Sequence, residues 1–326
     1  MTAAAPNRYC KGMHPTPPDR GKVATESPNP ATGGLGDMDI ADCVAALMAV
    51  DAEIIAAMAA ARPALTALIE RAAPGFAAGG RVITVGAGTS GRLAVLDAAE
   101  LGPTFCLEPG RFIALIAGGD AALRTSSEGR EDDPAEFAPA LGALNLGPHD
   151  TVIGLSAGGT TPCVLGALTL ARAAGAGTGL IACSPTAAAN AADLVVIIPT
   201  GPEAIAGSTR LKAGTATKMA LNLISTALMI ADGRVHENLM VDVRPANAKL
   251  IDRAARIITR LTGAERDAAL ALLERAGGSV KVAVLMHERA LERAEAEAAL
   301  AAARGRLHAA LTSTAAIAPA PRTGSL

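Results

Sequence analysis

Two small, hydroxyl-rich loops are the first places in this sequence where residue types and spacing could do chemistry. Residues 81–86 (RVITVG) are strand-like and run directly into a Gly-Ala-Gly-Thr-Ser-Gly stretch that contains Gly88, Thr89 and Ser90. Backbone N–H groups at the start of the following helix, with two hydroxyl groups beside them, suit a phosphate monoester. The same residues could instead only form the turn and cap the helix.

This first loop also matches the G-x-G-x-x-G pattern of dinucleotide-binding proteins. That reading needs an acidic residue about 20 positions further on, to bind a ribose hydroxyl. The next strand-like run ends in a Gly-Gly-Asp stretch whose Asp120 lies roughly 30 positions beyond the glycines, too far for that pattern. A nicotinamide site is therefore the weaker interpretation.

A second loop of the same kind strengthens the phosphate hypothesis. Residues 151–155 (TVIGL) lead into a Ser-Ala-Gly-Gly-Thr-Thr-Pro stretch, with Ser156, Gly158, Gly159 and Thr161 as candidate ligand contacts. In a doubly wound parallel sheet both loops emerge at the carboxyl edge, where ligands bind. Neither loop carries a Walker lysine, so the pair predicts a small phosphorylated ligand and not ATP.

Composition excludes several other functions. The 326 residues carry a formal net charge of −2, with four Phe, one Tyr and no Trp. So few aromatics provide no stacking platform for single-stranded nucleic acid, and a near-neutral charge gives no sequence-independent grip on DNA or RNA. We therefore predict a small-molecule substrate and no nucleic-acid partner.

The elements that would position these loops follow from short apolar runs that alternate with helical sequence. Such alternation is typical of a doubly wound, mainly parallel α/β sheet covered on both faces. We expect five strands, at 81–86, 112–117, 151–155, 179–183 and 194–199, after N-terminal helical sequence that is broken at Pro63.

The chain divides into four predicted parts. Residues 1–36 are rich in proline and indicate an irregular arm, and residues 37–240 form the α/β domain with its N-terminal helices. Residues 241–312 turn helical and charged, which predicts a small bundle of two or three helices. Residues 313–326 resemble a free tail.

Cysteine usage and the N-terminus indicate the compartment. The five cysteines are odd in number and form no C-x-x-C pair, so we expect neither a disulfide framework nor a metal site. The first residues lack the apolar core of a secretory signal. The longest uncharged stretch, 151–171, is interrupted by the second loop. We therefore predict a cytoplasmic protein with no membrane partner.

The paired loops resemble those of the sugar isomerase (SIS) fold, and longer stretches are similar to the N-acetylmuramic acid 6-phosphate etherases. These stretches are residues 86–105 (GAGTSGRLAVLDAAELGPTF), the GSTRLKAGT block within 201–250, and Thr-Glu-Ser-Pro-Asn at 25–29. The similarity covers about residues 25–310. It implies cleavage of the D-lactyl ether at C3 of N-acetylmuramic acid 6-phosphate, giving N-acetylglucosamine 6-phosphate and D-lactate in the recycling of cell-wall amino sugars.

That reaction makes demands that two carboxyl groups can meet. In the open-chain sugar the C1 aldehyde acidifies the C2 proton, so a base can remove it while an acid protonates the departing ether oxygen. The same pair can then add water to the unsaturated intermediate. One carboxyl group must be kept protonated by its surroundings, and no metal or other cofactor is required.

By resemblance, Glu100 is the acid, and Glu131 or its neighbour Asp132 occupies the other acidic position. Sequence alone leaves open which of these two is the base. Glu100 ends an apolar helix, so partial burial is expected to raise its pKa. Ten helical residues separate Ser90 from Glu100, or about 15 Å, which exceeds the span from a 6-phosphate to C3. We therefore predict a homodimer in which Glu100 either lies on a shortened helix or serves the partner subunit's site.

The block around GSTRLKAGT adds candidate contacts that would close over the sugar phosphate: Glu203, Ser208 and Lys212. Helix capping by Ser208 is the alternative reading. The second loop departs from the A-S-G-R-T-P of the family, because Gly158 and Thr160 replace its serine and arginine. Two other functions stay open: a non-catalytic sugar-phosphate regulator of the glucokinase-regulator type, and an aldose–ketose isomerase.

Overall fold

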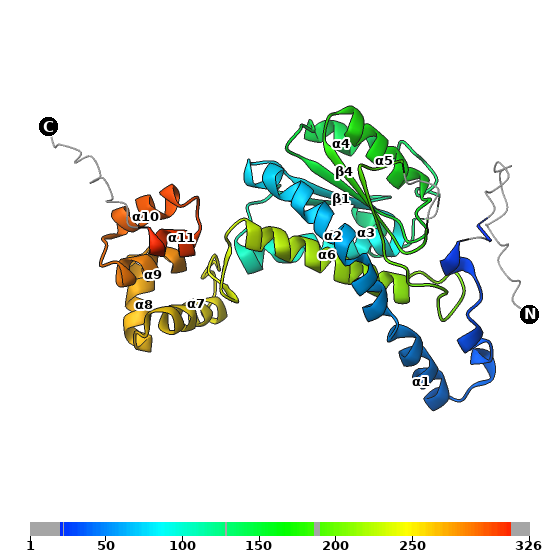
Figure 1. The fold of residues 1–326 in the computed structure, drawn as a ribbon, viewed down its shortest axis with the longest axis horizontal. Helices are drawn as coiled ribbons and strands as arrows, with labels where there is room; N and C mark the ends of the chain where they lie inside the picture. The colour runs from blue at the N-terminus through cyan, green and yellow to red at the C-terminus, as the bar shows by residue number, and fades with distance from the viewer. Residues whose placement is uncertain (1–19, 22, 128, 186–189, 314–326) are drawn as a thin grey trace, which may run out of the picture.

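The chain folds as a parallel α/β domain with helical extensions at both ends (Figure 1). The structure is a computed structural model that describes residues 20–21, 23–127, 129–185 and 190–313. The predicted tail beyond Ser313 and residues 1–19 and 22 of the predicted N-terminal arm lie outside these residues. From Ala24 the arm forms three short 3-10 turns, Ala24–Glu26, Pro30–Thr32 and Leu35–Asp37.

The five-stranded sheet is the centre of the domain. Its strands are β1 (Val82–Gly86), β2 (Phe112–Ile116), β3 (Thr151–Leu155), β4 (Gly177–Ala182) and β5 (Leu194–Ile197). They lie in the order β2-β1-β3-β4-β5, and every neighbouring pair is parallel. The predicted fold class and all five predicted strands are confirmed, and the order reverses beside β1, which creates a switch point where β1 and β3 meet.

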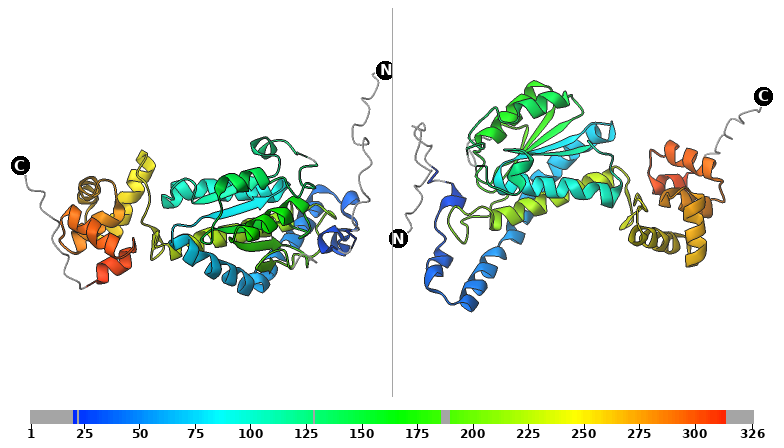
Figure 2. Two further views of the ribbon diagram at one scale, coloured as in Figure 1. Left: turned by 90° about the horizontal axis from the view of Figure 1, so that it is seen from above. Right: turned by 180° about the vertical axis from the view of Figure 1, so that it is seen from behind.

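Helices cover both faces of the sheet (Figure 2). On one face lie α2 (Ile54–Ala77), α3 (Gly88–Phe105) and α6 (Lys212–Ala231), and on the other lie α4 (Ala138–Leu144) and α5 (Pro162–Ala173). Alternate residues of each strand serve the two cores: Ile153 packs with the first helices, and Val152 with the second. Burial of both faces explains why the strands are continuously apolar in sequence.

Small residues let these helices lie close to the sheet. A side chain at Gly179 of β4 would sit 2.6 Å from Leu68 of α2, and one at Gly154 of β3 would sit 2.6 Å from Val164 of α5. Such distances leave no room for a Cβ atom. The few aromatics and the many small residues of the composition are thus consistent with tight helix–sheet packing.

The N-terminal helices differ from the expectation. The predicted break at Pro63 is wrong, because α2 continues through both Pro63 and Pro74. Pro63 is exposed, and so is Ala59, whose carbonyl the proline leaves without a helical partner. The helical path changes instead near Ala52, between α1 (Ile40–Asp51) and α2, and α1 extends away from the sheet (Figures 1 and 2).

The C-terminal region contains more helices than expected. Five helices replace the predicted two or three: α7 (Ala248–Thr262), α8 (Arg266–Arg275), α9 (Val280–Glu288), α10 (Arg293–Ala302) and α11 (Leu307–Thr312). Glycines with positive φ end several of them, such as Gly263 after α7. These helices enclose a core of their own, which is separate from the two cores of the sheet.

A short hairpin, β6 (Val235–His236) and β7 (Leu239–Met240), leads from α6 to this bundle. Two contacts between described residues illustrate how the parts are joined. Arg306 donates to the carbonyl of Ala231 at 2.6 Å, and the rings of His236 and His308 stack with centroids 6.1 Å apart.

One stretch of the described chain, Ile40–Ala77, is long and apolar enough to cross a membrane by length and composition. It comprises α1 and α2. Only 22% of its most apolar window is buried, and three residues of α1, Ile40, Val44 and Met48, expose their side chains at helical spacing. Among the residues that the structure describes, none covers this apolar stripe on the projecting helix.

Candidate functional site

The first loop begins the candidate site at the carboxyl edge of β1. Gly88 opens α3 with a φ of 52°, and Thr89 and Ser90 occupy the first turn, half-buried. A Cβ at Gly91 would lie 2.5 Å from the carbonyl oxygen of Gly86. Glycine at this position therefore lets the start of α3 approach the strand, with its N-terminal N–H groups directed over the sheet edge, where an anion is stabilised.

The second loop follows β3 and is held by its own hydroxyl groups. The Ser156 and Thr161 hydroxyls lie 2.7 Å apart, and the Thr161 N–H donates to Ser156 Oγ at 3.2 Å. Ser156 is buried, and the Ser156 N–H donates to the carbonyl of Ile181 on the neighbouring strand β4. The loop is thus preorganised around Ser156, with Gly158 at its half-exposed tip.

Both loops face one cavity of about 250 Å³. The predicted site residues that line it are Gly88, Thr89, Ser90, Glu131, Ser156, Gly158 and Thr161. Hydroxyl groups, a helix N-terminus and one of the predicted carboxylates therefore converge as the sequence indicated. A cavity of this size with polar walls suits a small polar ligand.

Glu131 reaches this cavity from the segment after β2. Its carbonyl accepts a hydrogen bond of 3.0 Å from the N–H of Cys163 in the first turn of α5, which ties the acidic segment to the second loop. Burial raises the pKa of the Cys163 thiol to about 12, so this thiol stays protonated and is no nucleophile. Asp132 is exposed and does not line the cavity.

Glu203 lies outside the cavity and caps a helix. It is fully buried, and its two carboxylate oxygens accept from the backbone N–H groups of Lys212 and Ala213, at 2.9 and 2.8 Å. These are the first residues of α6, so Glu203 satisfies its orphan donors and complements its dipole. Ser208, in the turn before α6, does not line the cavity and makes no side-chain cap.

Lys212 is turned away from the cavity as well. Its side chain is fully buried, and Nζ donates to Glu53 at the start of α2 at 2.5 Å. This pair joins α6 to the projecting N-terminal helices. Gly159 is buried in the second loop behind the cavity lining.

Glu100 lies far along α3, exposed to solvent and outside the cavity. The helix is not shortened, since it runs to Phe105, so that alternative for bringing Glu100 close is wrong. The partial burial that we expected for Glu100 is also absent from the single chain. One turn earlier, Asp97 is buried and accepts from Asn222 and Ser225, which fixes α3 against α6.

The cavity has a wall that sequence reasoning missed. Arg20, Val23 and Glu26 of the N-terminal arm line it, together with Thr160, Gly207 and Thr209. The sequence signal for this wall is the Thr-Glu-Ser-Pro-Asn motif at residues 25–29, for which the sequence alone predicted no role. The second loop carries Thr160 at the position where the similar family has arginine. Arg20, from the N-terminal arm, contributes a cation to the same cavity.

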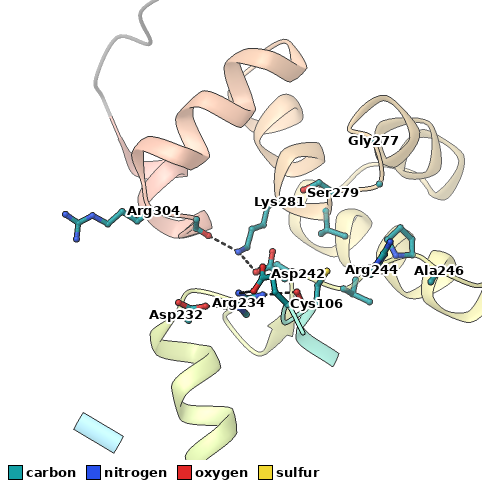
Figure 3. A pocket seen from close by; sticks show the side chains of 17 residues that line it. Cys106, Asp232, Arg234, Asp242, Arg244, Ala246, Gly277, Ser279, Lys281 and Arg304 are labelled. Carbon is teal, nitrogen blue, oxygen red and sulfur yellow. Dashed lines mark hydrogen bonds and ion pairs between the residues drawn. The ribbon is translucent and has the colours of Figure 1, made fainter. Parts of the chain in front are cut away.

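A larger cavity, of about 600 Å³, lies at the junction with the C-terminal bundle (Figure 3). It contains none of the predicted site residues. Its buried charges are paired: Lys281 donates to Asp242 at 2.5 Å, and Arg234 bonds to Asp232 and Glu108. Arg304 points away from this cluster (Figure 3). The ion pair between Lys281 of α9 and Asp242 stabilises the junction. Arg244 also lines the cavity and is exposed.

Among the described residues, no group of three or more His, Cys, Asp or Glu side chains is arranged to hold a metal ion. The parallel sheet, its switch point and the two hydroxyl-rich loops define a sugar isomerase domain. A family model for the glucokinase regulatory protein N-terminal SIS domain matches residues 64–172.

Curated relatives place the chain more narrowly. An N-acetylmuramic acid 6-phosphate etherase of Synechococcus elongatus is 48% identical over 301 residues, covering 92% of this chain and 98% of the relative. The enzyme of that name from Serratia proteamaculans is 47% identical over 293 residues, covering 90% of this chain and 99% of the relative. The chain belongs to the N-acetylmuramic acid 6-phosphate etherase family. Among solved structures, a phosphoheptose isomerase from Francisella tularensis has a TM-score of 0.46 at 19% identity, covering 59% of this chain and all of that one.

Proposed function

We propose that this protein cleaves the D-lactyl ether of N-acetylmuramic acid 6-phosphate with water, giving N-acetylglucosamine 6-phosphate and D-lactate in the recycling of cell-wall amino sugars. The observation that carries the proposal is the single cavity that gathers both hydroxyl-rich loops and Glu131. It belongs to a chain that matches curated etherases over nearly their full length. The N-terminus of α3 and the hydroxyls of Thr89 and Ser90 would bind the 6-phosphate.

Of the predicted acidic residues, Glu131 is the one that lines the cavity, which supports a catalytic role for it. We assign it as the base that removes the C2 proton, so that the C2–C3 double bond forms as the C3–O bond breaks and lactate leaves with a proton from the acid. Water then adds at C3, and the proton returns to C2. Asp132, outside the cavity, takes no part in this scheme.

The acid in this scheme is Glu100, supplied by a second copy of the chain. Leu96, four residues before Glu100 and so on the same side of α3, is about half exposed. Leu223 and Ile230 on the adjacent helix α6 are exposed to a similar degree. An apolar face of this kind favours an isologous homodimer. Burial in such an interface would give Glu100 the apolar surroundings that an acid needs.

The direct test incubates purified protein with N-acetylmuramic acid 6-phosphate and measures D-lactate. We expect lactate from the wild type and from Glu274→Gln, a control that removes an exposed charge of α8. We expect turnover to fall by about a thousandfold in Glu131→Gln, because an amide cannot accept the C2 proton. Absence of lactate from the wild type would reject the proposed function.

A mixed dimer tests the shared site. Co-expressed Glu100→Gln and Glu131→Gln subunits form heterodimers in which one site combines both intact carboxylates. These heterodimers should recover about half of the wild-type activity, because one of the two sites of a C2 dimer is complete. Heterodimers as inactive as either parent would show that each site is contained within one chain.

We also place the reaction in the cytoplasm. The described cysteines, Cys43, Cys106, Cys163 and Cys183, are all free thiols, which supports a reducing compartment. The apolar stripe of α1 is assigned to the dimer and not to a membrane. Flotation of the protein with lipid vesicles, with no dimer in solution, would contradict this assignment.

A further inference from the structure

The N-terminal arm forms a fixed wall of the sugar-phosphate cavity. Within it we define the strap as residues 23–32. Thr25 is fully buried, its N–H faces Ser184 Oγ at 3.4 Å, and its carbonyl accepts from the N–H of Gly207 at 2.8 Å. Further along the strap, Asn29 donates to the carbonyl of Pro202 and Thr32 to that of Ala204.

These contacts join segments about 170 residues apart, and they carry the one acidic side chain of the strap into the cavity. Glu26 follows the buried Thr25 and lines the cavity together with Gly207. The carboxylate of Glu26 occupies the space beside Gly207: a Cβ there would lie 2.7 Å from Glu26 Oε2. Gly207 also has a φ of 74°, which disfavours any other residue.

The charge of Glu26 is unexpected for a cavity that binds a phosphate. The other charged groups of the lining are Glu131 and Arg20. Two carboxylates beside a phosphate repel it, and this cost must be offset when the ligand binds. A sugar offers the compensation, because its hydroxyl groups are donors and an ionised carboxylate accepts up to four hydrogen bonds.

We propose that Glu26 contacts the substrate and accepts hydrogen bonds from hydroxyl groups of the sugar, while the two loops bind its phosphate. The proposal rests on the proposed function for the identity of the sugar. It makes the strap a determinant of specificity for a phosphorylated sugar over phosphate alone. The family resemblance assigns proton transfer to Glu100 and an acid of the Glu131 segment, and it assigns no role to Glu26.

Calorimetric binding of N-acetylglucosamine 6-phosphate and of inorganic phosphate separates the two contributions. Glu26→Gln should weaken binding of the sugar phosphate about tenfold, because the charge-assisted hydrogen bonds are lost, and should leave binding of inorganic phosphate as in the wild type or tighter. Gly207→Ala, whose Cβ displaces the carboxylate, should weaken sugar-phosphate binding in the same way. Asp37→Asn, an exposed carboxylate beyond the strap, is the matched control and should bind both ligands as the wild type does.

Three results would overturn the proposal: unchanged binding of both ligands by Glu26→Gln, an equal loss of both ligands, or wild-type binding by Gly207→Ala. An equal loss would mean that the strap only supports the fold of the cavity. Failure of the Glu26 proposal is distinguishable from failure of the proposed function. Wild-type protein that binds the sugar phosphate but releases no D-lactate rejects the etherase and leaves the Glu26 measurement valid. Wild-type protein that binds no sugar phosphate rejects both.

Discussion

At the scale of single residues, the structure separates carboxylates that line the cavity from those that hold the fold. Glu26 and Glu131 line it, whereas Glu203 is buried with both oxygens bonded to the first N–H groups of α6. Burial raises the pKa of Glu203 by more than the two hydrogen bonds lower it, so the pKa lies above its usual value. The role of Glu203 near the site is therefore to begin α6 at a fixed point.

Replacement of Glu203 should affect stability more than binding. Glu203→Ala leaves two buried N–H groups without acceptors and should lower the free energy of unfolding by about 3 kcal/mol. Urea denaturation of the two proteins measures this loss, and calorimetry with inorganic phosphate at low temperature should show an affinity within about threefold of the wild type. Full stability with lost phosphate binding would place Glu203 in the site after all.

At the scale of elements, one ionic cluster fixes the opposite edge of the sheet. Asp150, just before β3, accepts from the backbone and side chain of Arg81, just before β1, and from the N–H of Gly147. Burial alone would raise the pKa of Asp150, but the hydrogen bonds from Arg81 and Gly147 outweigh it and lower the pKa. These bonds help to set the register of the two strands that carry the hydroxyl-rich loops.

Stability should follow the ionisation of Asp150. Its folded pKa lies below the unfolded value of about 3.9, so its contribution is present above that pH and is lost as the pH falls through the folded pKa. Asp150→Asn should lower the free energy of unfolding by about 2 kcal/mol at pH 7, and the difference from the wild type should shrink below about pH 4. Chemical denaturation at several pH values between 7 and below about 4 measures this difference in the free energy of unfolding, with Glu274→Gln as the control. A difference independent of pH would exclude the ionised form as its source.

At the scale of the whole molecule, the exposed apolar residues of α1 and of the α3–α6 face suit the homodimer that we propose. Val44 and Met48 lie one helical turn apart on the exposed apolar stripe of α1. Lys212 links this region to the domain, because its buried ammonium pairs with Glu53 where α2 begins. The projecting helix is therefore anchored at its base by an ion pair and a continuous α2.

Charges placed on this stripe should separate the subunits. Val44→Glu combined with Met48→Glu should yield a monomer by light scattering, since carboxylates would be desolvated in the interface. Lactate release should fall at least tenfold, because Glu100 then has no neighbouring site to serve. Leu170→Glu, a comparable exposed apolar residue on α5 at the other face of the sheet, should leave mass and activity unchanged. A double variant that stays dimeric would place the interface elsewhere.

The sequence predicted those elements of the fold that depend on short runs of neighbouring residues. Short apolar runs that end in glycine and hydroxyl residues predicted the five strands and the positions of the two hydroxyl-rich loops, because buried parallel strands must be apolar and loops at their ends need small residues. It failed at Pro63, where an exposed carbonyl tolerates a proline within α2. It also undercounted the C-terminal helices, whose glycine-terminated turns are short.

The site was predictable only in part. Glu203 and Lys212 belong to a block whose resemblance indicated ligand contacts, yet spacing cannot show that both side chains turn into the protein. Glu26 reaches the cavity because its neighbours in the strap bond to Ser184, Pro202, Ala204 and Gly207, and no local pattern encodes these tertiary contacts. Arg20 lines the same cavity from a position just before the strap. The predicted domain boundary at residues 240–241 and the roles of the site residues stay predictions.

The strap also sets an order of assembly. The strap is synthesised early, but the residues that it bonds to are synthesised more than 150 residues later. These partners are Ser184, Pro202, Ala204 and Gly207. Closing the loop between the strap and these partners is slow. The contacts that offset its entropy cost can form only after β4, β5 and the following turn have formed. The cavity therefore acquires its last wall late in folding. Until then, the growing chain can present the two loops but lacks the carboxylate of Glu26 beside them.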